Sequence, residues 1–192
     1  MKEKKVILPT TTELEKELKS EKYKSRYKSL LHSTVNTLVI VAAFCIIIAT
    51  LFLPVLQISD TTMSPKLKNG DIVVAIKKEK FKPGDIIAFY YNNRILVKRV
   101  IAISSQWVSL DKDGNVYVDN MLLNEKYVVD KTFGESDLDY PYQVPENSYF
   151  VLSDQRSIAI DSRNSTIGCI TKENIIGKVT FAVWPLKEFG VI

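Results

Sequence analysis

The sequence predicts a mainly β protein, an antiparallel sheet or partial barrel preceded by one N-terminal transmembrane helix. The stretch 35–56 is almost wholly apolar, and at ~1.5 Å per residue it can cross a hydrocarbon core of ~30 Å. After residue 57 the chain changes to short β-branched and aromatic runs separated by turn residues, which is typical of strands. We therefore divide the chain into a basic tail (1–33), a transmembrane helix (34–56) and a β domain (57–192).

The apolar stretch has two competing interpretations. A cleaved signal peptide would have a shorter apolar region and an Ala-x-Ala site after it, and the sequence shows neither. A buried core helix would carry a polar face, which is also missing here. A permanent membrane anchor therefore fits best.

Basic charge is concentrated in the tail. The first 33 residues hold nine Lys or Arg and five Glu, which accounts for the whole net charge of +4. The β domain is therefore close to neutral, and this argues against a nucleic-acid partner. A basic flank stays in the cytoplasm, so we expect a single-pass protein of the plasma membrane with its β domain outside. Residues 13–28 can form a helix, either simply solvated or docked to a cytoplasmic partner.

The sequence offers few ligands for a metal or a disulfide. Cys45 lies within the apolar stretch and Cys169 lies far beyond it, so we expect no bridge between them. His32 is the only histidine, and no zinc site can be assembled from this set.

The β domain divides into short strands joined by tight turns. Asn92-Asn93 and Asp113-Gly114 are typical hairpin turns, whereas 131–147 is polar and predicts an irregular excursion. No segment after residue 57 shows a helical period of helix length. The expected strands are 71–76, 85–91, 95–103, 107–110, 115–118, 149–152 and 175–184, and the stretch 118–123, with Asp119-Asn120, suggests one more hairpin.

The first candidate for catalysis is the hydroxyl of Thr62, just beyond the apolar stretch, with Lys98 as its partner. Lys98 stands in an apolar strand, and two orientations are open. It can point to solvent along an edge strand. Alternatively it points inward, where desolvation lowers its pKa so that the neutral amine takes a proton from the hydroxyl.

A third motif follows the strand at 149–152. Asp154-Gln155-Arg156 and Asp161-Ser162-Arg163 place two acids and two arginines close together. Such a set suits a rigid network of ion pairs, although on a surface it would contribute little stability.

Together and in this order, these motifs resemble those of type I signal peptidases, which are membrane-bound proteases with a Ser/Lys dyad. The resemblance implies a signal peptidase-like β catalytic domain. The resemblance covers nearly the whole chain, from the basic tail to the strand containing Gly177-Lys178. It implies that Thr62 is the nucleophile, that Lys98 is the general base, and that substrates are preproteins with small residues at the first and third positions before the cut. It also implies a domain that rests on the lipid bilayer and needs neither a metal nor a cofactor. The residues expected to support the site are Asp60, Thr61, Met63, Pro65, Arg99, Asp154, Arg156, Ala159, Asp161 and Arg163.

The sequence departs from the family pattern at sensitive positions. Thr62 replaces a serine, and its β-branch restricts χ1. Asp60 replaces a glycine and either opposes the reaction or turns to solvent. Ala159 replaces a serine that orients the lysine. Met63 keeps two interpretations: it contacts the bilayer or the floor of the site, or it packs in the core of the domain. Two hypotheses follow: a working Thr/Lys protease, or a catalytically impaired binding protein for exported or pilin subunits.

Overall fold

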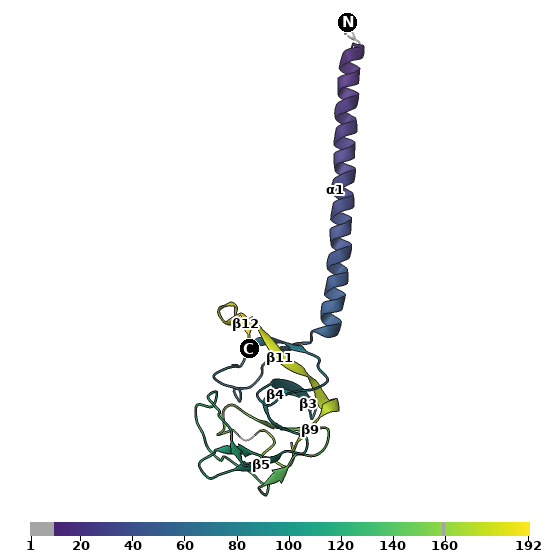
Figure 1. Ribbon diagram of the computed structural model, residues 1–192. Coiled ribbons are helices and arrows are strands. Elements are labelled where there is room, and N and C mark those ends of the chain that lie inside the picture. The colour runs from purple at the N-terminus through teal and green to yellow at the C-terminus, as the bar shows by residue number, and fades with distance from the viewer. Residues whose placement is uncertain (1–9, 159) are drawn as a thin grey trace. The chain divides into compact units, whose positions relative to one another are not determined.

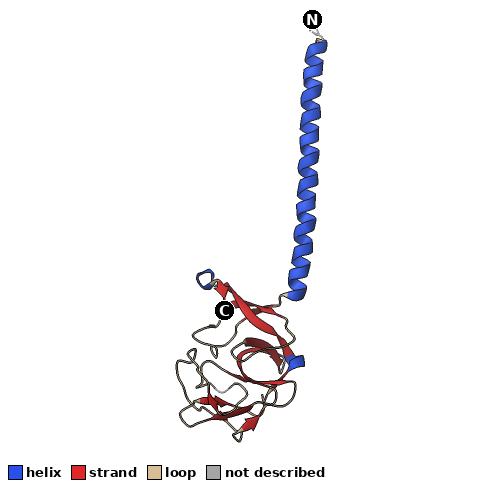
Figure 2. Cartoon of the chain, viewed as in Figure 1, coloured by secondary structure: helices blue, strands red, loops and turns tan. Residues whose placement is uncertain are grey.

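The computed structural model describes residues 10–158 and 160–192, without the side chains of 50–52. Contacts divide the chain into two compact units, one ending at Ala49 and the other covering Thr50–Ile192. Figures 1 and 2 show a long helix in the first unit and a β domain in the second. Each unit is described by itself below.

Helix α1 (Thr11–Phe52) runs through both the tail and the apolar stretch. Its first turn is capped, because the Glu13 carboxylate accepts hydrogen bonds from the backbone N–H and the hydroxyl of Thr10, both at 2.9 Å. The hydroxyls of Thr34 and Thr37 donate to the carbonyls four residues earlier. These two polar groups are thus satisfied within the helix itself, as an apolar environment requires.

By length and composition, α1 is the one helix in the described ranges that could cross a membrane. Its apolar side chains, among them Leu38, Ile40 and Phe44, are exposed. The helix ends at Phe52, before the predicted end of the span at residue 56. Pro54 follows, and the chain then pairs as a strand. This earlier end is physically reasonable, because proline cannot continue a helix.

The larger sheet of the domain is antiparallel throughout, in the order β1-β2-β11-β3-β4-β9-β10, with β12 also paired to β11. Its two ends, β1 and β10, are not paired to each other, so the sheet is open rather than a closed barrel. Its strands are β1 (Val55–Gln57), β2 (Ile72–Ile76), β3 (Ile86–Tyr91), β4 (Arg94–Ile103), β9 (Ser148–Leu152), β10 (Ile170–Thr171), β11 (Ile175–Trp184) and β12 (Gly190–Val191).

A smaller sheet has the order β7-β6-β5-β8. Its strands are β5 (Trp107–Leu110), β6 (Val116–Val118), β7 (Met121–Leu122) and β8 (Tyr142–Gln143). Beyond the end of α1, the helices described in this unit are two 3₁₀ turns, η1 (Lys172–Asn174) and η2 (Leu186–Glu188). The prediction of a mainly β, antiparallel domain behind one apolar helix is therefore confirmed.

Two predicted hairpins form as tight turns. Asn92 and Asn93 join β3 to β4 with φ of 43° and 62°, and Asp119 and Asn120 join β6 to β7 with φ of 51° and 65°. Two successive positive φ angles match the right-handed twist of the flanking strands. The first of these hairpins sets the register of β4, in which Lys98 lies opposite Ile87.

One of the domain's three apolar clusters fixes the segment between β1 and β2. Ile58, Met63 and Leu67 from this segment pack with residues of β2, β3, β4 and β11, including Val73 and Val97. Met63 is fully buried there, so its contacts are with the core of the domain. These apolar anchors on either side of Thr62 hold the loop against the sheet.

Candidate active site

The loop that carries Thr62 is held by backbone hydrogen bonds as well as by its apolar anchors. Ile58 N–H donates to the Asp71 carbonyl at 2.8 Å, and Gly70 N–H donates to the Ile58 carbonyl at 2.8 Å. Gln155 N–H donates to the carbonyl of Thr62 at 2.9 Å. The predicted nucleophile is thereby tied to the Asp154–Arg156 motif, and its side chain is only 2% exposed.

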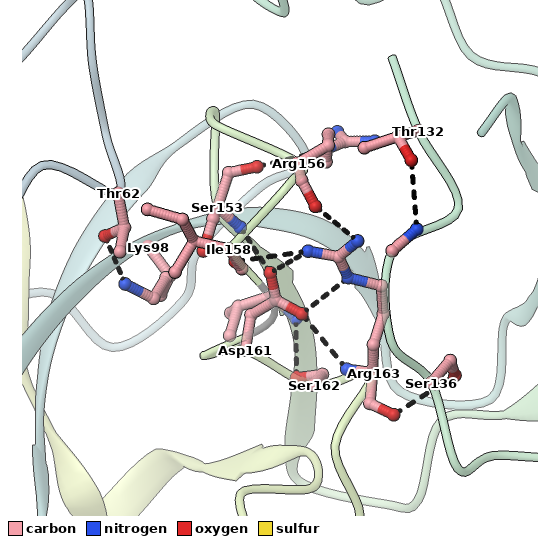
Figure 3. Close-up of polar contacts among 12 residues, drawn as sticks. Thr62, Lys98, Thr132, Ser136, Ser153, Arg156, Ile158, Asp161, Ser162 and Arg163 are labelled. Atoms are coloured by element: carbon pink, nitrogen blue, oxygen red, sulfur yellow. Dashed lines mark hydrogen bonds and ion pairs between the residues drawn. The ribbon is translucent and has the colours of Figure 1, made fainter. Parts of the chain in front are cut away.

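Lys98 points inward from β4 and is fully buried. Its Nζ lies 2.5 Å from Thr62 Oγ1 (Figure 3). The two residues are 36 positions apart in sequence, so the register of β4 and the loop after β1 together produce this contact. Of the two orientations open from the sequence, the structure has the inward one.

Burial lowers the pKa of Lys98 below that of an ordinary lysine. The carboxylates of Asp60, Asp161 and Asp154 act in the opposite direction, because each favours the ammonium form. Desolvation is the larger effect. The neutral form of the amine, which can accept a proton, is therefore populated at a lower pH than in a solvated lysine.

Asp60 turns toward Thr62 rather than away from it. Its Oδ1 accepts hydrogen bonds from the Thr62 backbone N–H at 3.0 Å and from the Thr62 hydroxyl at 2.7 Å. Its Oδ2 lies 4.0 Å from Lys98 Nζ, and the side chain remains 32% exposed. Asp60, Thr62 and Lys98 thus form one polar cluster.

Behind this cluster lies a network of buried ion pairs. Arg99 donates to both oxygens of Asp154, at 2.8 and 2.5 Å. Arg163 donates to both oxygens of Asp161, each at 2.9 Å, and Asp161 Oδ2 also accepts from Ser153 N–H at 2.9 Å (Figure 3). Because these groups are almost completely buried, the pairs satisfy charges that would otherwise be very costly.

The third arginine of the network, Arg156, pairs with a residue that the sequence analysis missed. Its guanidinium binds Glu125, which is 4% exposed. Tyr127 donates its hydroxyl to Glu125 at 3.1 Å, and its ring lies 4.0 Å from the guanidinium of Arg99. A charge count could have revealed this partner, because three buried arginines require three acids and the motifs supply only Asp154 and Asp161.

The remaining predicted residues lie at different depths. Thr61 and Pro65 belong to the same turn as Thr62 but have exposed side chains. Ala159 lies outside the described residues. Ser153 is fully buried, and its Oγ is the one buried side-chain polar atom in the described ranges without a hydrogen-bond partner.

An open cleft of about 950 Å³ adjoins the cluster. Gln57, Ser59 and Asp60 line it on one side and residues 91–96 of the β3–β4 hairpin on another. Asp60 is therefore the member of the polar cluster that a ligand in the cleft would meet. Within residues 10–158 and 160–192, no group of His, Cys, Asp and Glu is placed to hold a metal ion.

A buried amine in contact with a hydroxyl beside a cleft is an arrangement in which the hydroxyl can be activated for attack on a carbonyl, as in hydrolases. The family model described as "Signal peptidase, peptidase S26" matches residues 31–184. The chain belongs to this family of peptidases. Its relatives include proteins named signal peptidase I.

Three relatives illustrate the similarity. Over 182 residues the chain is 26% identical to signal peptidase I of Bacillus amyloliquefaciens, covering 89% of this chain and 97% of that protein. It is 32% identical over 152 residues to signal peptidase IB of Staphylococcus aureus, covering 69% and 78%. It is 33% identical over 146 residues to thylakoidal processing peptidase 1 of Arabidopsis thaliana, covering 67% of this chain and only 41% of that protein.

Proposed function

We propose that this protein is a membrane-anchored signal peptidase that removes N-terminal signal peptides from exported preproteins, with Thr62 as nucleophile and Lys98 as general base. The observation that carries this proposal is the 2.5 Å contact between Thr62 Oγ1 and the Nζ of a fully buried lysine. A protein that only bound its partners would gain nothing from burying an amine, which costs free energy. Family membership supports the same conclusion.

In the proposed mechanism, the neutral amine of Lys98 takes the proton of Thr62 as Oγ1 attacks the carbonyl carbon of the scissile peptide bond. The resulting ammonium gives this proton to the departing amine, which leaves an ester between Thr62 and the signal peptide. Water then attacks the ester as Lys98 accepts its proton. The bond between the acyl carbon and Thr62 Oγ1 breaks, Lys98 returns the proton to Oγ1, and the signal peptide leaves with a free carboxyl group. Burial supports this cycle because it lowers the pKa of the amine.

The cleft beside Asp60 is the proposed binding site for the preprotein. Its position next to Thr62 would bring an extended peptide to the hydroxyl. By similarity to the family, the substrates have small residues at the first and third positions before the cut. Helix α1 would hold the enzyme in the lipid bilayer, with residues 1–33 in the cytoplasm, the apolar part of α1 up to Phe52 in the membrane and the β domain, whose first strand is β1, outside.

This topology predicts where an external protease can cut. In intact cells, we expect added protease to cleave within the polar excursion at 131–147 and to leave 13–28 intact. Fragments identified by mass spectrometry would show the sites. Cleavage within 13–28, with 131–147 protected until the cells are lysed, would contradict the proposed orientation.

One observation favours the second candidate function, a signal peptidase-like protein that binds exported or pilin subunits without cutting them. The Thr62 hydroxyl donates its hydrogen bond to Asp60, so its proton points away from the lysine. The relatives named as signal peptidases give this candidate no support, and we rank it second.

Substitutions at Thr62 test the choice between these functions. We expect Thr62→Ala to abolish cleavage of a secretory preprotein by the detergent-solubilised protein. We expect Thr62→Ser to raise the rate about tenfold, because removing the methyl group frees the oxygen to reach the carbonyl at the correct angle. Product formation is measured by gel electrophoresis. If the parent protein and Thr62→Ser both leave the preprotein intact, the binding function is favoured.

A further inference from the structure

The hydroxyl of Thr62 has one proton and two neighbours that compete for it. Asp60 Oδ1 lies 2.7 Å from Thr62 Oγ1, and Lys98 Nζ lies 2.5 Å from the same oxygen. An ionised carboxylate can only accept hydrogen bonds. The proton of Thr62 therefore points to Asp60, and the amine must donate in its own contact with Oγ1.

This arrangement is the reverse of what base catalysis needs. To leave the hydroxyl, the proton must point at the lone pair of a neutral Nζ. With the proton held by Asp60, Lys98 meets the oxygen as an N–H donor, in either protonation state, and its lone pair does not receive the proton. The two arrangements exclude each other, so the carboxylate determines which one the free protein adopts.

We propose that Asp60 is a positioning residue that keeps the Thr62–Lys98 pair in a resting state, with the hydroxyl proton directed away from the amine. This inference rests on the proposed function and specifies how the site would be controlled. Asp60 acts through Thr62 and Lys98 and does not itself take part in bond making. Its 32% exposure and its place in the cleft wall make it the member of the cluster that can change its partner.

The charges around Lys98 single out Asp60 as the controlling group. Asp154 and Asp161 also face the amine, but each is held on both oxygens by an arginine. Among the described residues, Lys98 is the one cation within 4.0 Å of Asp60. The other charged groups near the site are Arg94 in the cleft wall and the paired set Arg99, Arg156, Arg163 and Glu125.

The direction of the pH effect follows from these charges. Of the three carboxylates that raise the pKa of Lys98 against the effect of burial, Asp60 has the largest influence. Removing its charge lowers the pKa of the amine. The neutral form is then present at lower pH, and the acidic limb of the rate profile moves to lower pH.

Two substitutions separate the charge of Asp60 from its geometry. Asp60→Asn keeps an oxygen that can accept from the Thr62 backbone and hydroxyl, but the charge is lost. Asp60→Gly removes the acceptor as well. We expect the rate of cleavage at neutral pH to increase in the order parent, Asp60→Asn, Asp60→Gly. The expected gain for the glycine variant is about tenfold, because lowering a pKa by one unit raises the neutral fraction by this factor.

The first experiment measures cleavage of a secretory preprotein by the full chain in detergent over a pH series. Asp130→Asn is the control for loss of one exposed surface charge.

A second readout is independent of cleavage. Lysine labelled with ¹³C at Cε is followed by NMR over the same pH series, and the Lys98 signal is the one that is missing from the spectrum of Lys98→Met. We expect its midpoint to fall by about one pH unit in Asp60→Asn and to stay unchanged in Asp130→Asn.

Several results would overturn this inference. A turn-forming role alone predicts that Asp60→Asn matches the parent in both rate and titration. A role for Asp60 as the base predicts that Asp60→Asn loses activity. Failure of Asp60→Gly to gain activity would also refute the resting state, whatever the titration shows. By contrast, cleavage that survives Thr62→Ala and Lys98→Met would refute the proposed function itself, and the two failures are thus distinguishable.

Discussion

Replacing Lys98 with methionine should reduce the rate of preprotein cleavage at least about 10²-fold, the lower end of what a positioned general base contributes. The physical reason is that Nζ lies 2.5 Å from Thr62 Oγ1 and is the group that accepts the hydroxyl proton in the proposed forward reaction. Asp60, the other neighbour of this hydroxyl, takes no part in bond making in that mechanism. Methionine has a similar length and no proton to exchange. The measurement is single-turnover cleavage by the purified full-length protein in detergent.

Lys98→Arg is the matched control for this experiment. Arginine keeps a cation beside Thr62 and Asp60 but cannot lose its proton in a protein, so it should be as inactive as methionine. Thermal unfolding should show that Lys98→Met is no less stable than the parent, because it removes a buried amine from an apolar strand. Substantial cleavage by Lys98→Arg would contradict the role of Lys98 as a base.

The longer strands could be predicted from the sequence because each combines β-branched or aromatic residues with a turn signal at its ends. Asn92-Asn93 is the clearest case: both residues adopt positive φ, as a two-residue hairpin requires. The shorter strands β1, β8, β10 and β12 have two or three residues each. Strands of this length have no periodicity of their own and exist only because a neighbouring strand offers backbone partners.

The orientation of Lys98 could not be predicted from its strand alone. Six consecutive residues of β4, from Val97 to Ala102, are buried, so both faces of the strand are covered and alternation does not identify a solvent side. The two adjacent cations are accommodated differently: Arg99 is paired with Asp154, whereas Lys98 is placed where its pKa falls. Only the order of the motifs along the chain indicated the inward position.

The position of Asp60 shows a different limit of sequence reasoning. Whether its carboxylate faces solvent or Thr62 depends on the conformation of a single turn, in which Asp60 Oδ1 accepts from the Thr62 backbone N–H two residues later. Aspartate often makes such a local bond, but the sequence does not show that the hydroxyl shares the same oxygen. The structure supplies this contact at 2.7 Å.

Replacing Arg163 with methionine should lower the free energy of unfolding by about 3–5 kcal/mol, the usual cost of leaving one charge of a buried pair without its partner. Arg163 is fully buried and donates to Asp161 through two nitrogens. Its Nη1 also donates to the carbonyls of Phe133 and Arg156, at 2.9 and 2.8 Å. The substitution therefore leaves the buried Asp161 carboxylate without its cation and removes the donor to both carbonyls.

Urea unfolding of the full chain in detergent, followed by the fluorescence of Trp107 and Trp184, measures this loss. The double variant Arg163→Met with Asp161→Asn should recover part of the stability, because it also removes the orphaned charge. Lys68→Met serves as the control, since it breaks an exposed pair with Glu188 and should not change the midpoint measurably. Equal midpoints for Arg163→Met and the parent would show that this pair does not hold the 153–163 segment behind Lys98, and the scaffold of the site would have to lie elsewhere.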